Sequence, residues 1–181
     1  TPASAINGTA ISQPGPFDFV ANLPTSIQFR VGEDTSLLRF ALTDELVDVE
    51  GADIDLYLFR CVDFSCTEVT SSTGPGSNEN IAVVNPVPND PSDPGALYIL
   101  FAQGVDTVGE PSVDYTSLYW FVDQKESTTR VTASPRAVAN RYQNIYLMAR
   151  GLDPNQLYMG TMTFFDNTGE SQGTTILEVQ P

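Results

Sequence analysis

The sequence predicts an all-β protein, an antiparallel β-sandwich followed by a smaller β-sheet. Apolar and polar residues alternate with a period of two along most of the chain, as they do in half-buried strands. β-Branched and aromatic residues fill these runs, whereas the 13 glycines and 13 prolines gather between them. No segment shows the sustained i, i+3, i+4, i+7 pattern with caps that an amphipathic helix requires.

Six strand-like runs occupy the first two thirds of the chain. They cover residues 26–31, 36–43, 53–59, 80–85, 96–104 and 115–122. Most breaks between them carry turn residues, as in "STGPGSNEN" and "NPVPNDPSDPG", where Gly, Pro, Asn and Asp supply turn conformations. The nearest helical candidate, residues 134–144, is short and begins with Ser-Pro, so we expect at most one or two turns there.

A polar stretch, "DQKESTT", separates two predicted units. We assign residues 1–125 to the first β-sandwich and residues 128–181 to a short fibronectin-III-like segment. The second segment contains about four strands, "TRVTAS", "NIYLMARGL", "LYMGTMTFFD" and "TTILEV". Since a fibronectin-type sandwich needs about seven strands and about 100 residues, this tail must pack on its neighbour. The alternative is that residues 1–30 pair with the tail and complete its sheet.

Two local patterns predict structural details. Four residues separate Cys61 from Cys66 in "RCVDFSC", which fits a hairpin tip where facing Cβ atoms approach closely enough for a disulfide. The alternative is two free thiols, and the spacing does not match a C-x-x-C redox or zinc motif. In the tail, Leu152 and Pro154 precede Tyr158 at a spacing typical of a tyrosine corner.

The charge balance excludes two classes of partner. There are 23 acidic and 8 basic residues, for a net charge of −15, which disfavours nucleic acid and anionic membranes because both are bound by clustered Lys and Arg. The basic residues are spread along the chain, at Arg30, Arg39, Arg60, Lys125, Arg130, Arg136, Arg141 and Arg150. No apolar run approaches the ~20 residues of a transmembrane helix. We interpret the chain as a mature portion or a fragment of a larger secreted protein whose export signal lies elsewhere.

Catalytic patterns are missing from the sequence. There is no histidine, so neither a Ser-His-Asp triad nor a HExxH zinc site can form. The single lysine, Lys125, lies in the polar stretch and is a poor nucleophile. A pair of carboxylates could serve a glycosidase, but 23 acids make some such pair unavoidable. We expect no catalytic residues and no organic cofactor.

The stretch "DVEGADIDLYLF" concentrates four carboxylates, those of Asp48, Glu50, Asp53 and Asp55. In an extended strand Asp53 and Asp55 share one face, and the apolar residues from Ile54 onward share the other. One hypothesis is a calcium site, since calcium accepts six to eight oxygens in flexible geometry. The other is a solvated strand entry whose acids keep the sheet soluble.

The order of these pieces resembles a known family. "RFALTDELVDVEGADIDLYLF", "GSNENIAVVNP", "GALYILFAQG" and "DYTSLYWFV" follow one another as in the PPC (pre-peptidase C-terminal) type of β-sandwich, which has a jelly-roll-like fold. The tail "GLDPNQLYMGTMTFFDNTGESQGTTILEV" is similar to the short fibronectin-III-like piece that closes many secreted bacterial subtilisin-like serine proteases. The resemblance covers about residues 38–122 and 151–179.

This resemblance implies a non-catalytic accessory region that aids secretion, stability or substrate capture. Its partners would be an upstream protease catalytic domain in the same chain and an insoluble protein or polysaccharide substrate. Some PPC-like domains bind calcium, and Asp53 and Asp55 match the family's acidic positions. Two departures, "RCVDFSC" and the lengthened "VPNDPSDPG" loop, alter any inherited ligand surface.

The alternative function is a stand-alone adhesin-like or lectin-like module that binds carbohydrate or protein. A binding role predicts an exposed aromatic patch, for which Tyr115, Tyr119 and Trp120 are the candidates. In an alternating strand Tyr119 and Phe121 face one way and Trp120 the other. The competing interpretation is therefore that this run is mostly core.

Overall fold

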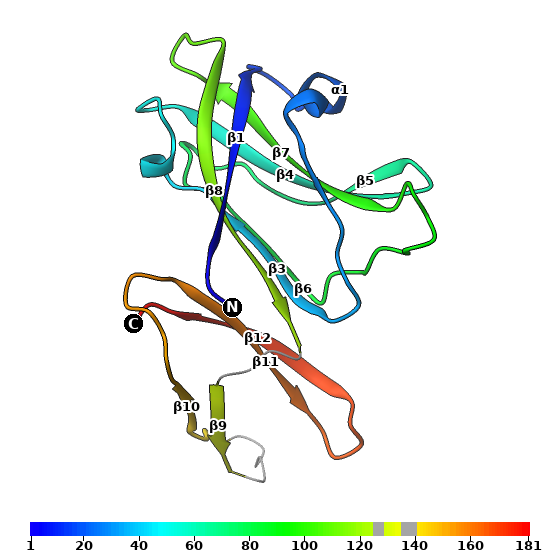
Figure 1. Ribbon diagram of the computed structural model, residues 1–181, viewed down its shortest axis with the longest axis vertical. Coiled ribbons are helices and arrows are strands. Elements are labelled where there is room, and N and C mark those ends of the chain that lie inside the picture. The colour runs from blue at the N-terminus through cyan, green and yellow to red at the C-terminus, as the bar shows by residue number, and fades with distance from the viewer. Residues whose placement is uncertain (125–128, 135–140) are drawn as a thin grey trace.

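The computed structural model describes residues 1–124, 129–134 and 141–181, and its regular structure is almost entirely β, which confirms the all-β prediction (Figure 1). Residues 135–140, within the predicted helical turn, lie outside the described residues. The strands are β1 (Ser4–Ser12), β2 (Ile27–Phe29), β3 (Thr35–Ala41), β4 (Asp53–Val62), β5 (Ser65–Ser72), β6 (Asn80–Val84), β7 (Leu97–Asp106), β8 (Ser112–Asp123), β9 (Thr129–Ala133), β10 (Ile145–Ala149), β11 (Tyr158–Phe165) and β12 (Ser171–Val179). The helical pieces are α1 (Phe19–Asn22), η1 (Leu23–Thr25) and η2 (Asp44–Leu46).

The first eight strands form one large sheet. Its order is β5-β4-β7-β1-β8-β3-β6, and β2 pairs with β7 off this path. The N-terminal strand β1 runs parallel to β7 and antiparallel to β8, and every other pairing in this sheet is antiparallel. The two end strands also approach each other, because the Asn80 N–H donates a hydrogen bond of 3.1 Å to Ser72 Oγ. The sheet therefore curls into a nearly closed sandwich.

The main core fills the inside of this curled sheet. In β4 the alternation places Ile54, Leu56 and Leu58 in the core, each with no exposed surface. Leu38 and Phe40 of β3 pack into the same cluster. Fully burying a side chain of this size contributes about 1.5–3 kcal/mol, so the period-two pattern carries much of the stability.

The opposite face of β4 is also covered. Tyr57 and Phe59 point outward, and the segment before and within α1 lays Phe17 and Phe19 over them. The Phe17 and Tyr57 rings stack with centroids 4.2 Å apart. Asp18 holds this cover in place, because its carboxylate accepts hydrogen bonds from the first backbone N–H groups of α1. Strand β4 is therefore covered on both faces.

The tail consists of two separate hairpins, β9–β10 and β11–β12. The second packs on the large sheet, where Met159 joins Leu37, Trp120 and Val122 in a small buried cluster. An ion pair of 2.8 Å between Arg39 and Glu178 also links the two.

The N-terminal segment contacts both parts of the chain. Strand β1 lies in the middle of the large sheet, whereas residues 1–3 lie against the tail. The Ala3 N–H donates to the Leu157 carbonyl at 2.8 Å, and the Met159 N–H donates to the Thr1 carbonyl at 2.9 Å. The division into units 1–125 and 128–181 stays a prediction.

Both local patterns read from the sequence are confirmed. Cys61 and Cys66 form a disulfide across the β4–β5 hairpin. In the tail, the backbone N–H of Asp153 donates a hydrogen bond of 2.9 Å to the hydroxyl of Tyr158, as in a tyrosine corner.

Candidate functional site

The structure does not gather the four carboxylates predicted to bind calcium. Asp48 lies in the loop before β4 and accepts a hydrogen bond of 3.0 Å from the Asp114 N–H, whereas Asp53 begins β4 opposite Asp106 of β7. Among the described residues, no three His, Cys, Asp or Glu side chains lie close enough to hold a metal ion. Calcium binding stays a prediction that depends on Asp53 and Asp55.

Asp55 is in an environment that disfavours its negative charge. Its side chain is nine-tenths buried and accepts a hydrogen bond of 3.2 Å from the Tyr57 hydroxyl. Burial raises the pKa of Asp55 to about 6, and the charges of Asp53 and Glu79 add to the effect. Burial also raises the pKa of Asp53, with a further contribution from Asp106. The negative charges of Asp53, Asp55 and Glu79 repel one another, so the folded structure is favoured when Asp55 binds a proton.

The aromatic residues proposed for ligand binding belong mainly to the core. Trp120 is 1% exposed and Tyr115 is 3% exposed, while the indole N–H of Trp120 donates to the Leu157 carbonyl at 3.3 Å. Tyr119 is half-buried and packs with Phe121 against the main core. The core interpretation is thus confirmed for Tyr115 and Trp120, and these residues form no exposed flat patch.

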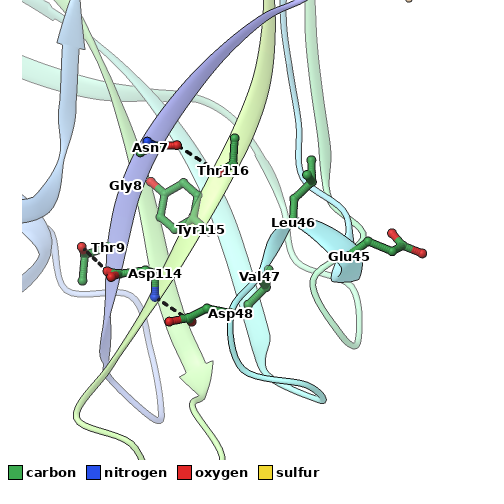
Figure 2. A pocket seen from close by; sticks show the side chains of 10 residues that line it. All are labelled: Asn7, Gly8, Thr9, Glu45, Leu46, Val47, Asp48, Asp114, Tyr115 and Thr116. Atoms are coloured by element: carbon green, nitrogen blue, oxygen red, sulfur yellow. Dashed lines mark hydrogen bonds between the residues drawn. The ribbon is translucent and has the colours of Figure 1, made fainter. Parts of the chain in front are cut away.

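An open groove of about 560 Å³ lies where β1, β8 and the η2 loop meet (Figure 2). Its walls combine carboxylates, hydroxyls and amides with two apolar side chains. The lining residues are Asn7, Gly8, Thr9, Glu45, Leu46, Val47, Asp48, Asp114, Tyr115 and Thr116. Sequence reasoning missed this site, except for Asp48 and Tyr115, because the residues come from three segments that only the sheet topology brings together.

The β1–β8 pairing fixes one wall of the groove. Asn7 lies opposite Thr116 and Thr9 lies opposite Asp114 in the antiparallel register. Thr116 Oγ1 donates to Asn7 Oδ1 at 3.0 Å, and Thr9 Oγ1 donates to Asp114 Oδ1 at 2.7 Å. These cross-strand bonds hold the polar groups in place before any ligand arrives.

The η2 loop forms the other wall and is fastened to β8. The Asp114 N–H donates to the Asp48 carboxylate, and the Asp48 N–H donates to the Asp114 carbonyl, both at 3.0 Å. Val47 adds a β-bridge to Tyr115. Glu45, on η2, is exposed and forms no hydrogen bond within the described residues. Asp48 and Asp114 each use only one carboxylate oxygen in these contacts, so the wall keeps free acceptors.

Tyr115 forms the floor of the groove and lies against Gly8 of β1. A Cβ atom on Gly8 would come within 2.4 Å of the Tyr115 hydroxyl oxygen, so only glycine leaves room for the ring. The hydroxyl is buried and has no hydrogen-bond partner among the described residues. Burial raises its pKa to about 12, so it is neutral at ordinary pH and can both donate and accept a hydrogen bond. An unpaired buried polar group of this kind costs about 1–3 kcal/mol.

The groove therefore presents hydrogen-bond acceptors to its ligand. Glu45, Asp48 and Asp114 supply negative charge, and none of the lining residues is basic. Such a surface suits guanidinium or ammonium groups, which carry several donors and no acceptor. Sugar hydroxyls, which both donate and accept, fit the same acceptors less strongly.

Comparison with known proteins places no further constraint on the site. The chain matches no protein-family model, no curated protein and no solved structure. Within the described residues, no helix has the length and apolar character needed to cross a membrane. The functional conclusion has to come from the groove itself.

Proposed function

We propose that this chain is a non-catalytic binding module of a secreted protein, and that the groove holds a cationic ligand. The observation that carries this proposal is that Glu45, Asp48 and Asp114 all line one open groove that contains no basic side chain. Tyr115, which also lines this groove, has a buried hydroxyl with no hydrogen-bond partner among the described residues.

The chemistry favours a guanidinium or ammonium group over a neutral ligand. Charge-assisted hydrogen bonds are about twice as strong as neutral ones, and a guanidinium can meet two carboxylates at once. The net charge of −15 also attracts cations over longer distances and raises their association rate. A cationic segment of a structural protein, or an amino sugar polymer, would meet these requirements.

An extracellular role agrees with the disulfide, since such bonds persist in oxidising compartments. The resemblance to the PPC-like region supports a place beside a subtilisin-like serine protease, where the groove would capture substrate for the catalytic domain. A stand-alone adhesin-like or lectin-like module is the second candidate. Determining the residues encoded upstream of Thr1 separates these two, because a subtilisin-like catalytic domain there supports the first.

Ligand binding can be tested with soluble and insoluble probes. We expect retention on chitosan, but less on chitin and cellulose, and binding of a labelled oligoarginine measured by fluorescence anisotropy. Insoluble collagen and keratin serve as protein probes. The variant Glu45→Gln/Asp114→Asn should weaken oligoarginine binding about 10- to 100-fold, as expected for losing charged hydrogen bonds.

A matched control removes two exposed charges away from the groove, with Glu33→Gln/Glu170→Gln. If both variants lose the same affinity, binding reflects only the overall negative charge, and the groove is not the site. If the protein binds none of these probes, the proposed function is contradicted.

A further inference from the structure

Although no two basic residues are adjacent in the sequence, five of the eight fall in one segment, residues 125–150. Residues 125–150 contain five of the eight bases and one acid, a net charge of +4, whereas the rest contains three bases and 22 acids, a net charge of −19. Three of the five bases lie in the described part, at Arg130, Arg141 and Arg150, and all three are exposed. The β9–β10 hairpin is thus a positive element on a strongly negative molecule.

This hairpin also exposes apolar side chains. Val131 is 50% exposed, Tyr146 66%, Leu147 43% and Met148 51%. Successive residues of a strand point to opposite faces. Val131 and Leu147 line a recess together with Met159 of β11, so the open face of β10 is the one that carries Tyr146 and Met148. An isolated two-stranded hairpin is marginally stable in water, and arginine combined with exposed Tyr and Met is typical of protein interfaces.

The hairpin and the groove lie in different parts of the molecule. In Figure 1 β9 and β10 occupy the end of the long axis opposite α1, beyond the β11–β12 hairpin. The groove lies beside the middle of β1, on the large sheet. A copy of the chain does not place its own hairpin in its own groove, so a contact between the two elements joins different copies.

We propose that the β9–β10 hairpin of one copy docks in the acidic groove of a second copy, so that the protein associates head to tail. This inference rests on the proposed function of the groove as a cation-binding site. Arg130 and Arg150 supply guanidinium groups for the carboxylates of Glu45 and Asp114, while the exposed apolar side chains meet the apolar wall around Leu46. Because the two surfaces differ, the contact is heterologous and repeats from copy to copy.

Salt dependence gives the first test. Sedimentation velocity of the wild-type chain should show concentration-dependent growth beyond a dimer at 50 mM NaCl, which is lost at 0.5 M NaCl because salt screens the attraction. A molecule of net charge −15 without such a contact would behave oppositely, since screening weakens repulsion. A wild-type chain that stays monomeric at low salt up to about 200 µM, or that grows only at high salt, overturns the proposal.

Exchange of charges gives the second test. Arg130→Glu/Arg150→Glu and Glu45→Lys/Asp114→Lys should each weaken self-association at least tenfold, and an equimolar mixture should restore growth. Circular dichroism checks that both variants fold, and Glu33→Lys/Glu170→Lys controls for the change in net charge. If the equimolar mixture does not regain self-association, the hairpin does not dock in the groove of a second copy. Should the groove variant still lose oligoarginine binding in that case, the cation-binding function stands while the self-association proposal fails.

Discussion

Replacing Asp55 by asparagine should stabilise the protein at neutral pH. Asparagine has nearly the same shape and keeps an acceptor for the Tyr57 hydroxyl, which donates to Asp55 Oδ2 at 3.2 Å. It removes the charge from a side chain that is 9% exposed and that faces the charges of Asp53 and Glu79. The substitution therefore isolates the cost of that buried charge.

The magnitude follows from the pKa of Asp55. Burial raises this pKa from 3.8 to about 6, a difference equivalent to about 3 kcal/mol at 1.36 kcal/mol per tenfold change. Allowing for screening by nearby solvent, we expect about 1–2 kcal/mol. Above pH 6 Asp55 is charged in both states and the folded state is penalised. Below pH 4 it is protonated in both states and the penalty is gone. The contribution of this residue to the free energy of unfolding thus increases as the pH falls from 6 to 4.

The measurement is urea unfolding at pH 7.5 and pH 4, followed by the fluorescence of Trp120, the single tryptophan, which is 1% exposed. Asp55→Asn should raise the free energy of unfolding by about 1–2 kcal/mol at pH 7.5 and change it little at pH 4. Glu33→Gln removes an equal charge from an exposed position. A destabilised Asp55→Asn at pH 7.5, or a gain no larger than that of Glu33→Gln, would refute the reasoning.

Three further predictions concern the groove floor, the disulfide and calcium. Gly8→Ala should cost about 1–3 kcal/mol by overpacking against Tyr115, measured by the same unfolding assay, whereas Gly32→Ala, with no atom nearer than 4.0 Å, should be close to neutral. Cys61→Ala/Cys66→Ala should cost about 2 kcal/mol in the loop-entropy model, and equal stability of the oxidised and reduced wild type would contradict this. The calcium hypothesis for Asp53 and Asp55 predicts a higher melting temperature in calcium than in EDTA. At a calcium concentration of 100 times Kd, binding should raise the free energy of unfolding by about 2.7 kcal/mol. An unchanged melting temperature removes that site.

The strands were predictable because burial selects a period of two. Each predicted strand corresponds to a strand of the structure, and in β4 the two faces separate as expected, with Leu56 in the main core and Tyr57 outside it. Strand β1 was missed as a member of the large sheet. Its sequence, "SAINGTAIS", has no large apolar residues besides Ile6 and Ile11 and no apolar–polar alternation, and its place between β7 and β8 depends on long-range pairing that local patterns do not contain.

The candidate site was less accessible to sequence reasoning than the fold. Asp48 was singled out, but as a calcium ligand with Asp53, because closeness along the chain suggested closeness in space. In the structure Asp48 instead meets Asp114, 66 residues later. Glu45 carried no signal of its own, since an exposed acid in a turn is common on any acidic chain.

The groove combines features that the fold alone does not require. Position 8, in the middle of β1, is a glycine, and an interior glycine lowers the stability of a strand by about 0.5–1 kcal/mol relative to alanine. The missing side chain leaves room for Tyr115, whose hydroxyl has no hydrogen-bond partner among the described residues. Phenylalanine at position 115 would fill the same space without a buried polar group. Glu45, Asp48 and Asp114 line the same groove on a chain that already carries a net charge of −15. The glycine and the unpaired hydroxyl lower the stability of the free protein, and the carboxylates of the groove offer a cationic ligand charge-assisted hydrogen bonds. The arrangement is therefore better explained by an occupant of the groove than by the packing of the sandwich.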